Sequence, residues 1–578
     1  MFKKISLRAI VACTCCLTML SSGFSQSIPI SPNLYGINAW MPDQIGSTNF
    51  NGQLFNLGPM ISSSGVKLMR YGGIAADKNP PTTSPNGGQC KKMIDFIRSL
   101  GAEPVIQVPC WGQQYTPQQA YDLVYYLNVS PYQLNIKYWS IGNEPDGQYK
   151  GTSGNYKAAD IAPYMIAFSK KMKSVPDPAS GPILIMGPEI TSFNPGNESD
   201  MIQKLTSDPT LANSSSIIGV DPQTNKPYID IITFHCYPFS GNQSRQNVID
   251  YPNGGFAANC ATLVNTYFAQ ANSFRPKANA LQFAVTEMNV DWNNPGTNDL
   301  WNVGAASFLA GQFWADLFSV AMKYSAFSIM PWSVHESGGS GNNTDLGYLG
   351  GQNGSVPRST YYHFQMVQHL TGNYCAGAIA STQNNIKVFG SKDANQVVVM
   401  IMNQQQSGSL TYRVRLDKAG ISGNEALKMN VDAGIPVEYV GSAPLDNQSS
   451  ILLFFDTRGN IRQELIYRLN VEAAAGNPPT SVNFTASVNN LNKPEPLLNI
   501  IPNPISSKAV LNYRLAENVK KAQVQVTTMN GQVLDTYILG LGSNSLELDC
   551  SKYPNGTYFF SLILDGVKME SNKMIIAK

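Results

Sequence analysis

Apolar runs of strand length alternate with amphipathic stretches from about residue 27 to residue 372. Eight such runs occur, among them "VKLMRYGG", "IKYWSIGNEP", "IDIITFHCYP" and "LQFAVTEMNV", and stretches such as "TPQQAYDLVYYL" separate them. Continuous apolar runs between helical patterns are typical of parallel strands that are covered by helices on their faces. Eight of these units favour a (β/α)8 barrel. An open doubly wound sheet is disfavoured, since no glycine-rich nucleotide loop follows the first run.

The hydrophobic period changes to two after this region. Alternating strands such as "NIKVFG", "QVVVMIM" and "SILLFF" predict an all-β sandwich over 373–470. Because these strands follow the last barrel helix without a linker, we expect them to bury an apolar face on the barrel. Residues 471–496 are rich in small residues, Asn and Pro, which is typical of a linker. A last, small β domain is expected over 497–578.

The first 26 residues have the pattern of a secretory signal peptide. Lys3, Lys4 and Arg8 precede the apolar segment "AIVACTCCLTML", and small residues follow it. That segment is shorter than the roughly 20 residues that a membrane span needs. A lipoprotein box ending at Cys13 is the other interpretation, but few apolar residues lie between Arg8 and Cys13. No later segment is apolar enough to span, so the sequence predicts an exported, soluble mature chain.

Composition narrows the class of partner. Charged residues make up 13% of the 578 residues and the net charge is +2, which argues against nucleic acid and against a highly charged partner. The apolar fraction of 43% can build sizeable cores, and the length suits two to four domains. The abundance of Asn, Gln, Ser, Gly and Tyr suits neutral sugars, but it also suits any secreted bacterial surface.

Cysteine and histidine give no metal motif. Of nine cysteines, Cys13, Cys15 and Cys16 lie in the signal segment, and the spacing of the others fits no zinc site. The four histidines show no ligand pair at helical or hairpin spacing. We therefore expect no metal and no cofactor. Cys236 and Cys260 are the first candidates for a disulfide, with free buried thiols as the alternative.

Two of the apolar runs close on a glutamate. "YWSIGNEPDG" places Glu144 at the end of the fourth strand, where alternation would turn it inward and Pro145 forbids continuation. "FAVTEMNVD" places Glu287 at the end of the seventh. Alone, each could be a helix N-terminal charge or a loop salt bridge. Together, at the catalytic end of one barrel, they can form the pair about 5–5.5 Å apart that retaining glycoside hydrolysis requires.

The motif "GNEP" on strand four, with a glutamate closing strand seven, resembles the clan A glycoside hydrolases. These are retaining enzymes with catalytic glutamates on those two strands, and the resemblance covers residues 27–372. It implies that Glu144 is the acid/base and Glu287 the nucleophile. It also implies that Asn143 hydrogen-bonds the 2-hydroxyl of the sugar.

A second motif agrees with this resemblance. "RYGG" is similar to the "R-[YF]-P-G-G" of clan A families that contain arabinofuranosidases, endoglucanases, xyloglucanases and heparanase-like enzymes, although Gly72 stands where proline is usual. Arg70 would then lie beside Glu287 and hold it ionised by charge.

Further candidates lie at the ends of strands six and eight. "FHCYP" places His235 and Tyr237 on the inner face, and the resemblance implies a hydrogen bond from Tyr237 to Glu287. "MPWSV" places Trp332 where the family has an aromatic floor under the cleaved sugar. Lesser candidates for sugar contact, with surface packing as the alternative, follow strands three, seven and eight: Trp111, Trp292 and His335.

The C-terminal segments "NIIPNPISSKAVLNYRL", "YPNGTYFFSLILDG" and "KMIIAK" resemble the sorting domain of the type IX secretion system of Bacteroidetes. The resemblance implies the secretion machinery as a partner and a secreted or outer-membrane surface location. An immunoglobulin-like or carbohydrate-binding sandwich is the alternative.

These patterns together predict a secreted, monomeric, retaining glycosidase. Its substrate would be a plant-type polysaccharide, either a β-glucan or a hemicellulose such as xyloglucan, xylan or arabinan. A non-catalytic surface carbohydrate-binding protein is the alternative from another class, and the intact machinery of Arg70 and Tyr237 around the glutamates argues against it. A transglycosylase would pass through the same covalent intermediate as a hydrolase.

Overall fold

A computed structural model gives two units, Met1–Thr485 and Ala486–Lys578, each with its own core. The predicted signal peptide lies outside the described residues. Within the part of the chain that is described, no helix is long and apolar enough to cross a membrane. The described residues are 27–39, 53–78, 80–83, 86–109, 115–147, 155–196, 200–293, 299–336, 344–351, 353–380, 384–418, 425–484, 498–513, 515, 519–529, 531–541 and 544–578.

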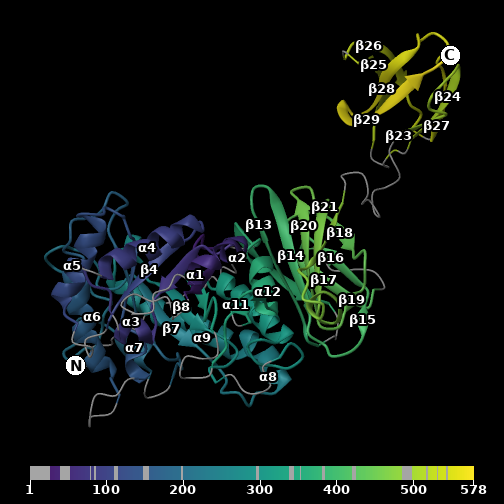
Figure 1. Cartoon of the computed structure of the whole chain (residues 1–578). Helices are drawn as coiled ribbons and strands as arrows, with labels where there is room; N and C mark the ends of the chain where they lie inside the picture. Colours follow the sequence, from purple (N-terminus) through teal and green to yellow (C-terminus); the bar gives the residue numbers. More distant parts are fainter. Residues whose placement is uncertain are drawn as a thin grey trace, which may run out of the picture. The chain divides into compact units, whose positions relative to one another are not determined.

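Eight parallel strands form the first sheet, in the order in which they occur along the chain. A parallel bridge between Tyr35 and Ile329 joins the first strand to the last, so the sheet closes on itself. Each strand falls within one of the eight predicted apolar runs, and the expected (β/α)8 barrel is confirmed (Figure 1). The strands are β2 (Gly36–Asn38), β3 (Leu68–Tyr71), β4 (Glu103–Val108), β5 (Tyr138–Ile141), β6 (Leu184–Ile190), β7 (Ile231–Cys236), β8 (Gln282–Met288) and β9 (Ser328–Pro331).

Helices connect the barrel strands. Local sequence explains where several of them begin: Thr116 and Gln119 form a capping box at the start of α5, and the Ser307 hydroxyl accepts from the Ala310 N–H at the start of α11. The helices are α1 (Gln53–Asn56), α2 (Gly58–Ser63), α3 (Ile74–Lys78), α4 (Asn86–Ser99), α5 (Pro117–Asn128), α6 (Ala158–Met172), α7 (Met201–Leu205), α8 (Arg245–Asp250), α9 (Ala257–Thr262), α10 (Ala269–Ala271), α11 (Phe308–Lys323) and α12 (Ser359–Val367).

The barrel strands are mostly apolar because both of their faces are buried. Side chains that point into the barrel form one cluster, and those that alternate with them pack under the helices. The inner cluster consists of Leu68, Val105, Tyr138, Met186, Ile231, Ala284, Phe327 and Met330.

A β-sandwich follows the barrel, as predicted. Strand β12 (Asn373–Ile379) belongs to both of its sheets, since its first residues pair with β13 and its last residues with β17. The strand order is β18-β16-β17-β12-β13-β14-β20-β21-β22. The remaining bounds are β13 (Ile386–Lys392), β14 (Gln396–Asn403), β16 (Tyr412–Arg415), β17 (Leu427–Val431), β18 (Glu438–Val440), β20 (Ser449–Asp456), β21 (Ile461–Arg468) and β22 (Thr480–Asn483).

The sandwich extends beyond the expected boundaries at both ends. Strand β1 (Ile28–Pro29) pairs with β12, although it was expected to belong to the barrel domain. Strand β22 pairs with β21, although it lies in the segment 471–496 that was expected to be a linker. The side chains of β22 are mostly exposed, so its composition is that of a linker while its backbone bonds are those of an edge strand.

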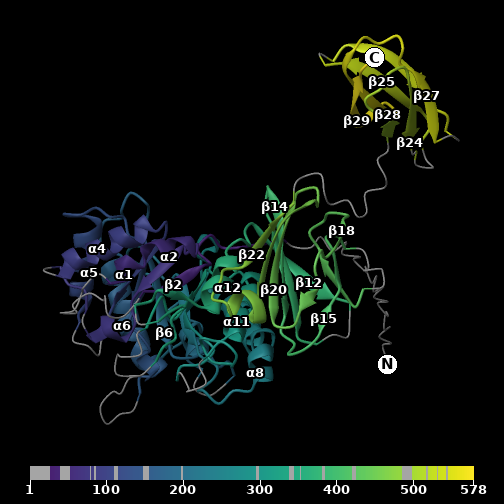
Figure 2. The ribbon, with the colours of Figure 1, turned by 45° about the vertical axis from the view of Figure 1, so that its right-hand side comes forward.

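One face of the sandwich packs on α11 and α12 (Figures 1 and 2). The alternation along β14 shows this directly, because Val397, Val399 and Ile401 belong to the sandwich core. The residues between them, Val398, Met400 and Met402, join the core of the barrel helices. Hydrogen bonds cross the same interface from Gln312 Nε2 to the Ser449 carbonyl (3.0 Å) and between His363 Nε2 and Ser450 Oγ (2.8 Å).

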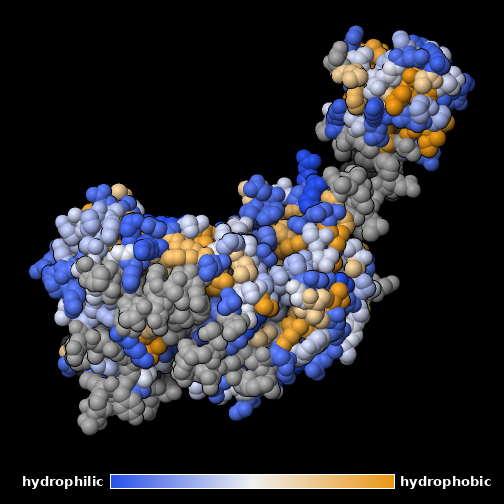
Figure 3. All heavy atoms as spheres, viewed as in Figure 1, coloured by the Kyte–Doolittle hydropathy of each residue, from blue (hydrophilic) through white to orange (hydrophobic). Residues whose placement is uncertain are grey.

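The second unit consists of two small sheets with strand orders β23-β24-β27 and β26-β25-β28-β29. Apolar side chains reach its surface (Figure 3), and the most exposed are Met529 and Ile538. The strands are β23 (Leu498–Ile501), β24 (Lys508–Tyr513), β25 (Ala522–Thr528), β26 (Val533–Ile538), β27 (Ser545–Asp549), β28 (Gly556–Leu564) and β29 (Val567–Ile576).

The candidate disulfide between Cys236 and Cys260 is not formed. All five cysteines of the described residues are buried free thiols, and Cys110 lies outside those residues. Cys236 Sγ lies 3.6 Å from the hydroxyl of Tyr251. The alternative interpretation of Cys236 and Cys260 as buried thiols therefore describes this structure.

Removing the second unit should leave the first unit stable. We expect a chain truncated after Thr485 to unfold at the wild-type temperature of the first unit, because the second unit has a separate core. Differential scanning calorimetry would measure this. A chain truncated after residue 470 is the matched control: it also loses β22 and the ion pair between Arg468 and Glu472, and its melting temperature should fall. Equal melting temperatures for the two truncations would show that β22 contributes nothing.

Candidate active site

A left-handed turn positions Glu144. Strand β5 ends at Ile141, and both Gly142 (φ 79°) and Glu144 (φ 47°) then have positive φ. The Glu144 N–H donates to the Glu189 carbonyl (2.8 Å), and Pro145 begins a single 3-10 turn. The strand alternation expected to aim Glu144 inward therefore stops three residues earlier, and the turn directs its side chain instead.

Glu287 lies within β8 and is held by two donors. Arg70 Nη1 forms an ion pair with Glu287 Oε1 at 2.8 Å, and the Tyr237 hydroxyl donates to Oε2 at 3.0 Å. Both contacts were expected from the sequence, and both are present. The side chain of Glu287 is 9% exposed and that of Glu144 is 33% exposed, so Glu287 is the deeper of the two.

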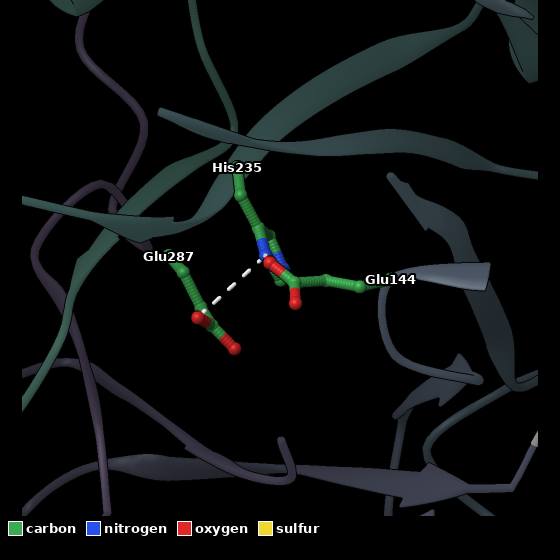
Figure 4. Close-up of side chains that lie close together, drawn as sticks. All are labelled: Glu144, His235 and Glu287. Carbon is green, nitrogen blue, oxygen red and sulfur yellow. Dashed lines mark hydrogen bonds and ion pairs between the residues drawn. The ribbon is translucent and has the colours of Figure 1, made fainter. Parts of the chain in front are cut away.

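His235 stands between the two glutamates (Figure 4). Its Nδ1 lies 2.9 Å from Glu144 Oε1 and 3.6 Å from Glu287 Oε2. One oxygen of each glutamate and a nitrogen of His235 lie within 4.8 Å of one another. The two carboxylates are therefore close enough for both to reach one bound group.

Charge decides where the proton of this cluster resides. Burial alone would lower the pKa of His235, but Glu287, Glu144 and Glu189 outweigh burial and raise it to about 10. Burial alone would raise the pKa of Glu144, but the hydrogen bond and charge of His235, together with Arg70, lower it. At neutral pH His235 is therefore an imidazolium and Glu144 a carboxylate. The proton that an acid at Glu144 needs is held by its neighbour.

A third buried carboxylate, Glu189, was missed in the sequence. It is fully buried at the end of β6, and its Oε2 lies 3.4 Å from His235 Nε2 and 3.5 Å from Arg70 Nη2. The Thr286 hydroxyl donates to the same oxygen. The run "PILIMGPEI" closes on a glutamate just as the runs of strands four and seven do, so the signal was present.

Arg70 organises the floor of the site. It is fully buried, and its two terminal nitrogens donate to Asn38 Oδ1 (3.0 Å), Gln107 Oε1 (3.1 Å) and Asn143 Oδ1 (2.8 Å). Burial alone would lower the pKa of Arg70, but the charges of Glu189 and Glu287 raise it. Asn38 and Gln107 were also missed, although each is the last polar residue of its apolar run.

Trp332 lies close to Glu287, and its role as an aromatic floor under the sugar stays a prediction. A Cβ atom added at Gly73 would lie 2.9 Å from the Trp332 ring and 4.0 Å from Glu287 Oε1, so ring and carboxylate flank the same point. The indole Nε1 donates to Glu336 Oε1 at 2.8 Å, which fixes the plane of the ring. Tyr237 packs against the small apolar cluster that contains Trp332.

Replacing Gly73 should lower the stability of the protein, although the substitution removes no charged group. Gly73→Ala places a side chain at φ +94° and against the Trp332 ring, so we expect a loss of about 1–3 kcal/mol in unfolding free energy. Urea denaturation would measure it. Gly88→Ala is the matched control, since Gly88 lies in α4 with no atom within 4 Å of its added Cβ. A Gly73→Ala protein as stable as the control would contradict the close approach of the ring.

The three lesser candidates for sugar contact have different outcomes. Trp292 is 55% exposed in the loop after β8 and stays a predicted sugar-stacking residue. His335 is fully buried, its Nδ1 faces the Leu349 carbonyl at 2.8 Å, and burial lowers its pKa. It therefore holds the following loop, and we do not retain it as a sugar contact. Trp111 lies outside the described residues.

The glutamates and His235 are also the only described group whose donor atoms cluster closely enough to hold a metal ion. Both ring nitrogens of His235 face carboxylate oxygens. The charges of the three glutamates raise the pKa of the ring to about 10, so it carries a proton at neutral pH. The cluster is better described as a carboxylate pair bridged by an imidazolium.

Residues 499–577 match a family model described as a secretion system C-terminal sorting domain. This confirms the predicted sorting domain, and with it the predicted destination at the cell surface or in the extracellular space by type IX secretion. No curated protein sequence matches the chain significantly.

Solved structures of glycoside hydrolases are among those similar to the chain. One is a Paenibacillus polymyxa xyloglucanase of glycoside hydrolase family 44, with 12% identity, 74% of this chain and 96% of that chain covered, and a TM-score of 0.48. Another is a bifunctional glucanase-xylanase from a metagenome library, with 13% identity, coverages of 74% and 96%, and a TM-score of 0.47. A third is a family 30 subfamily 8 xylanase from Clostridium acetobutylicum, with 13% identity, coverages of 74% and 95%, and a TM-score of 0.43.

Proposed function

We propose that the chain is a secreted retaining glycoside hydrolase that cleaves a plant-type polysaccharide. The observation that carries this proposal is the placement of Glu144 and Glu287 at the catalytic ends of the fourth and seventh barrel strands, with carboxylate oxygens within 4.8 Å. A protein that only binds sugar has no need for two facing carboxylates with a buried arginine and a tyrosine on one of them.

In the first step, Glu287 attacks the anomeric carbon and the bond to the leaving oxygen breaks. Arg70 and Tyr237 hold the two oxygens of Glu287, so the carboxylate is oriented before substrate arrives. Glu144, the more exposed of the two, gives the leaving oxygen a proton that it has taken from His235. In the second step Glu144 takes a proton from water, and that water releases the sugar from Glu287.

Substrate binding would supply the protonated acid. Glu144 is partly exposed in the free protein, and a bound sugar ring would remove its remaining water. Desolvation favours the neutral form of a carboxyl group. The proton on His235 Nδ1 would then pass to Glu144 Oε1 along the existing hydrogen bond, in which the nitrogen and the oxygen lie 2.9 Å apart.

The substrate class rests on the motif "RYGG" and on the aromatic side chains of the site. It is a β-glucan or a hemicellulose such as xyloglucan, xylan or arabinan. Trp332 would support the sugar at the cleavage point, Asn143 would bind its 2-hydroxyl, and the exposed Trp292 would stack on a ring further along the chain.

Purified protein and a panel of β-glucan, xyloglucan, xylan and arabinan would test this proposal. We expect release of reducing ends from at least one polysaccharide, and a first product with retained anomeric configuration by proton NMR. An inverted product would refute the retaining mechanism. Saturable binding of a polysaccharide without cleavage would instead establish a non-catalytic binding protein.

A further inference from the structure

The proton that the proposed mechanism needs is shared between His235 and Glu144. A third residue, Glu189, contacts the other side of the His235 ring and can influence which ring nitrogen gives up its proton. The His235 ring lies between two carboxylates: Nδ1 faces Glu144 Oε1 at 2.9 Å, and Nε2 faces Glu189 Oε2 at 3.4 Å. Each neutral tautomer of an imidazole has one donor and one acceptor nitrogen. When the doubly protonated ring loses one proton, the nitrogen that keeps its hydrogen therefore determines which nitrogen has released one.

The surroundings of Glu189 keep its carboxylate ionised and hold it in place. Its backbone N–H donates to Thr233 Oγ1 at 2.9 Å, its Oε2 receives the Thr286 hydroxyl, and Arg70 lies 3.5 Å away. The Arg70 and His235 charges outweigh burial and lower the pKa of Glu189. Its other oxygen, Oε1, is buried with no hydrogen-bond partner among the described residues. A buried carboxylate with an orphan oxygen costs stability, so a purely structural role explains it poorly.

We propose that Glu189 is a positioning residue that retains the Nε2 hydrogen of His235 and so makes Nδ1 the nitrogen that exchanges the catalytic proton with Glu144. This rests on the proposed function. When the N–H bond at Nδ1 breaks, its electron pair stays on the ring and an O–H bond forms at Glu144 Oε1. The ring is then neutral, with its hydrogen on Nε2 facing Glu189. Without the Glu189 charge, that tautomer loses its partner.

The groups that face His235 come from every element around it. Glu144 follows β5, Glu189 lies near the end of β6 and Glu287 lies on β8, while Arg70 on β3 pairs with Glu189 and Glu287. The Tyr237 hydroxyl reaches the site through its bond to Glu287. Replacing Glu189 by Gln removes one of three negative charges. The titration of His235 should therefore move to lower pH, by about one unit or more for a charge this close.

Nitrogen-15 NMR of histidine-labelled protein can observe this directly. The chain has four histidines, and burial lowers the pKa of His335, His363 and His369. We therefore expect one doubly protonated ring at pH 8 in the wild type, absent in His235→Gln. In Glu189→Gln it should titrate about one pH unit or more lower. Glu103→Gln is the matched control, because it removes the same charge from an exposed position at the start of β4.

The same variants should differ in their pH–rate profiles. Because the active form needs the shared proton, the alkaline limb of kcat/KM should shift to lower pH in Glu189→Gln and stay in place in the control. If Glu189→Gln does not fold, Glu189→Asp gives a smaller shift of the same sign. A His235 titration within about 0.3 pH unit of wild type in the folded variant would overturn the proposal. A shifted titration in a protein that cleaves no glycan would count against the proposed function alone.

Discussion

Glu287→Gln should lower kcat on an aryl glycoside by on the order of 10⁴-fold or more while leaving the fold intact. The amide cannot attack the anomeric carbon, so the covalent intermediate cannot form. The side chain keeps its size, and Arg70 keeps Glu189 as an ionic partner. Circular dichroism and the melting temperature serve as the control for folding. Substantial turnover by this variant would remove Glu287 from the reaction.

Glu144→Gln should show a different pattern. A polysaccharide has a poor leaving group and needs the acid, so its cleavage should be nearly abolished. An activated aryl glycoside needs little acid help in the first step but still needs the base in the second. Rapid release of one equivalent of phenol, followed by a slow steady state, is the expected result in stopped-flow measurements.

Azide distinguishes the two roles. With Glu144→Ala, azide should replace water in the second step and give a glycosyl azide of retained configuration. With Glu287→Ala, azide should attack directly and give the inverted azide. Swapped stereochemistry would mean that the acid/base and the nucleophile have been exchanged.

The barrel and its two catalytic candidates could be predicted from the sequence for a simple reason. A strand that is buried on both faces reads as a continuous apolar run, and a carboxylate at the end of such a run stands out against it. Barrel closure then brings the ends of the fourth and seventh strands together whatever the helices contain. Arg70 and Tyr237 followed from motifs at the ends of the second and sixth strands.

The surroundings of that pair could not be predicted so directly. Glu189 has the same local signal as Glu144, but its meaning depends on His235 and Arg70, which are distant in the sequence. The charge of His235 depends on three carboxylates at once. His335 was misjudged because its position after a strand end does not reveal that the next loop folds back over it.

A chain cut after Gly372 should fail to give a stable, monomeric barrel. The cut removes the sandwich face that packs on α11 and α12, a helix pair whose first member is buried along almost its whole length. The apolar side chains lost from that core include Val398, Met400, Met402, Leu452 and Phe454. At roughly 1.5–3 kcal/mol for each buried side chain, the loss is on the order of 10 kcal/mol. Whole domains are stable by only about 5–15 kcal/mol.

Size-exclusion chromatography and calorimetry would measure the outcome for residues 27–372. We expect aggregates and no cooperative unfolding transition, because apolar side chains of α11 would become exposed to water. The chain cut after Thr485 is the matched control, since it keeps the whole sandwich including β22. Ser450→Val in that chain adds a finer test: it leaves the buried His363 Nε2 without its partner and should lower the melting temperature. A monomeric 27–372 fragment with a sharp unfolding transition would show that the interface with the sandwich is not needed for the barrel to fold.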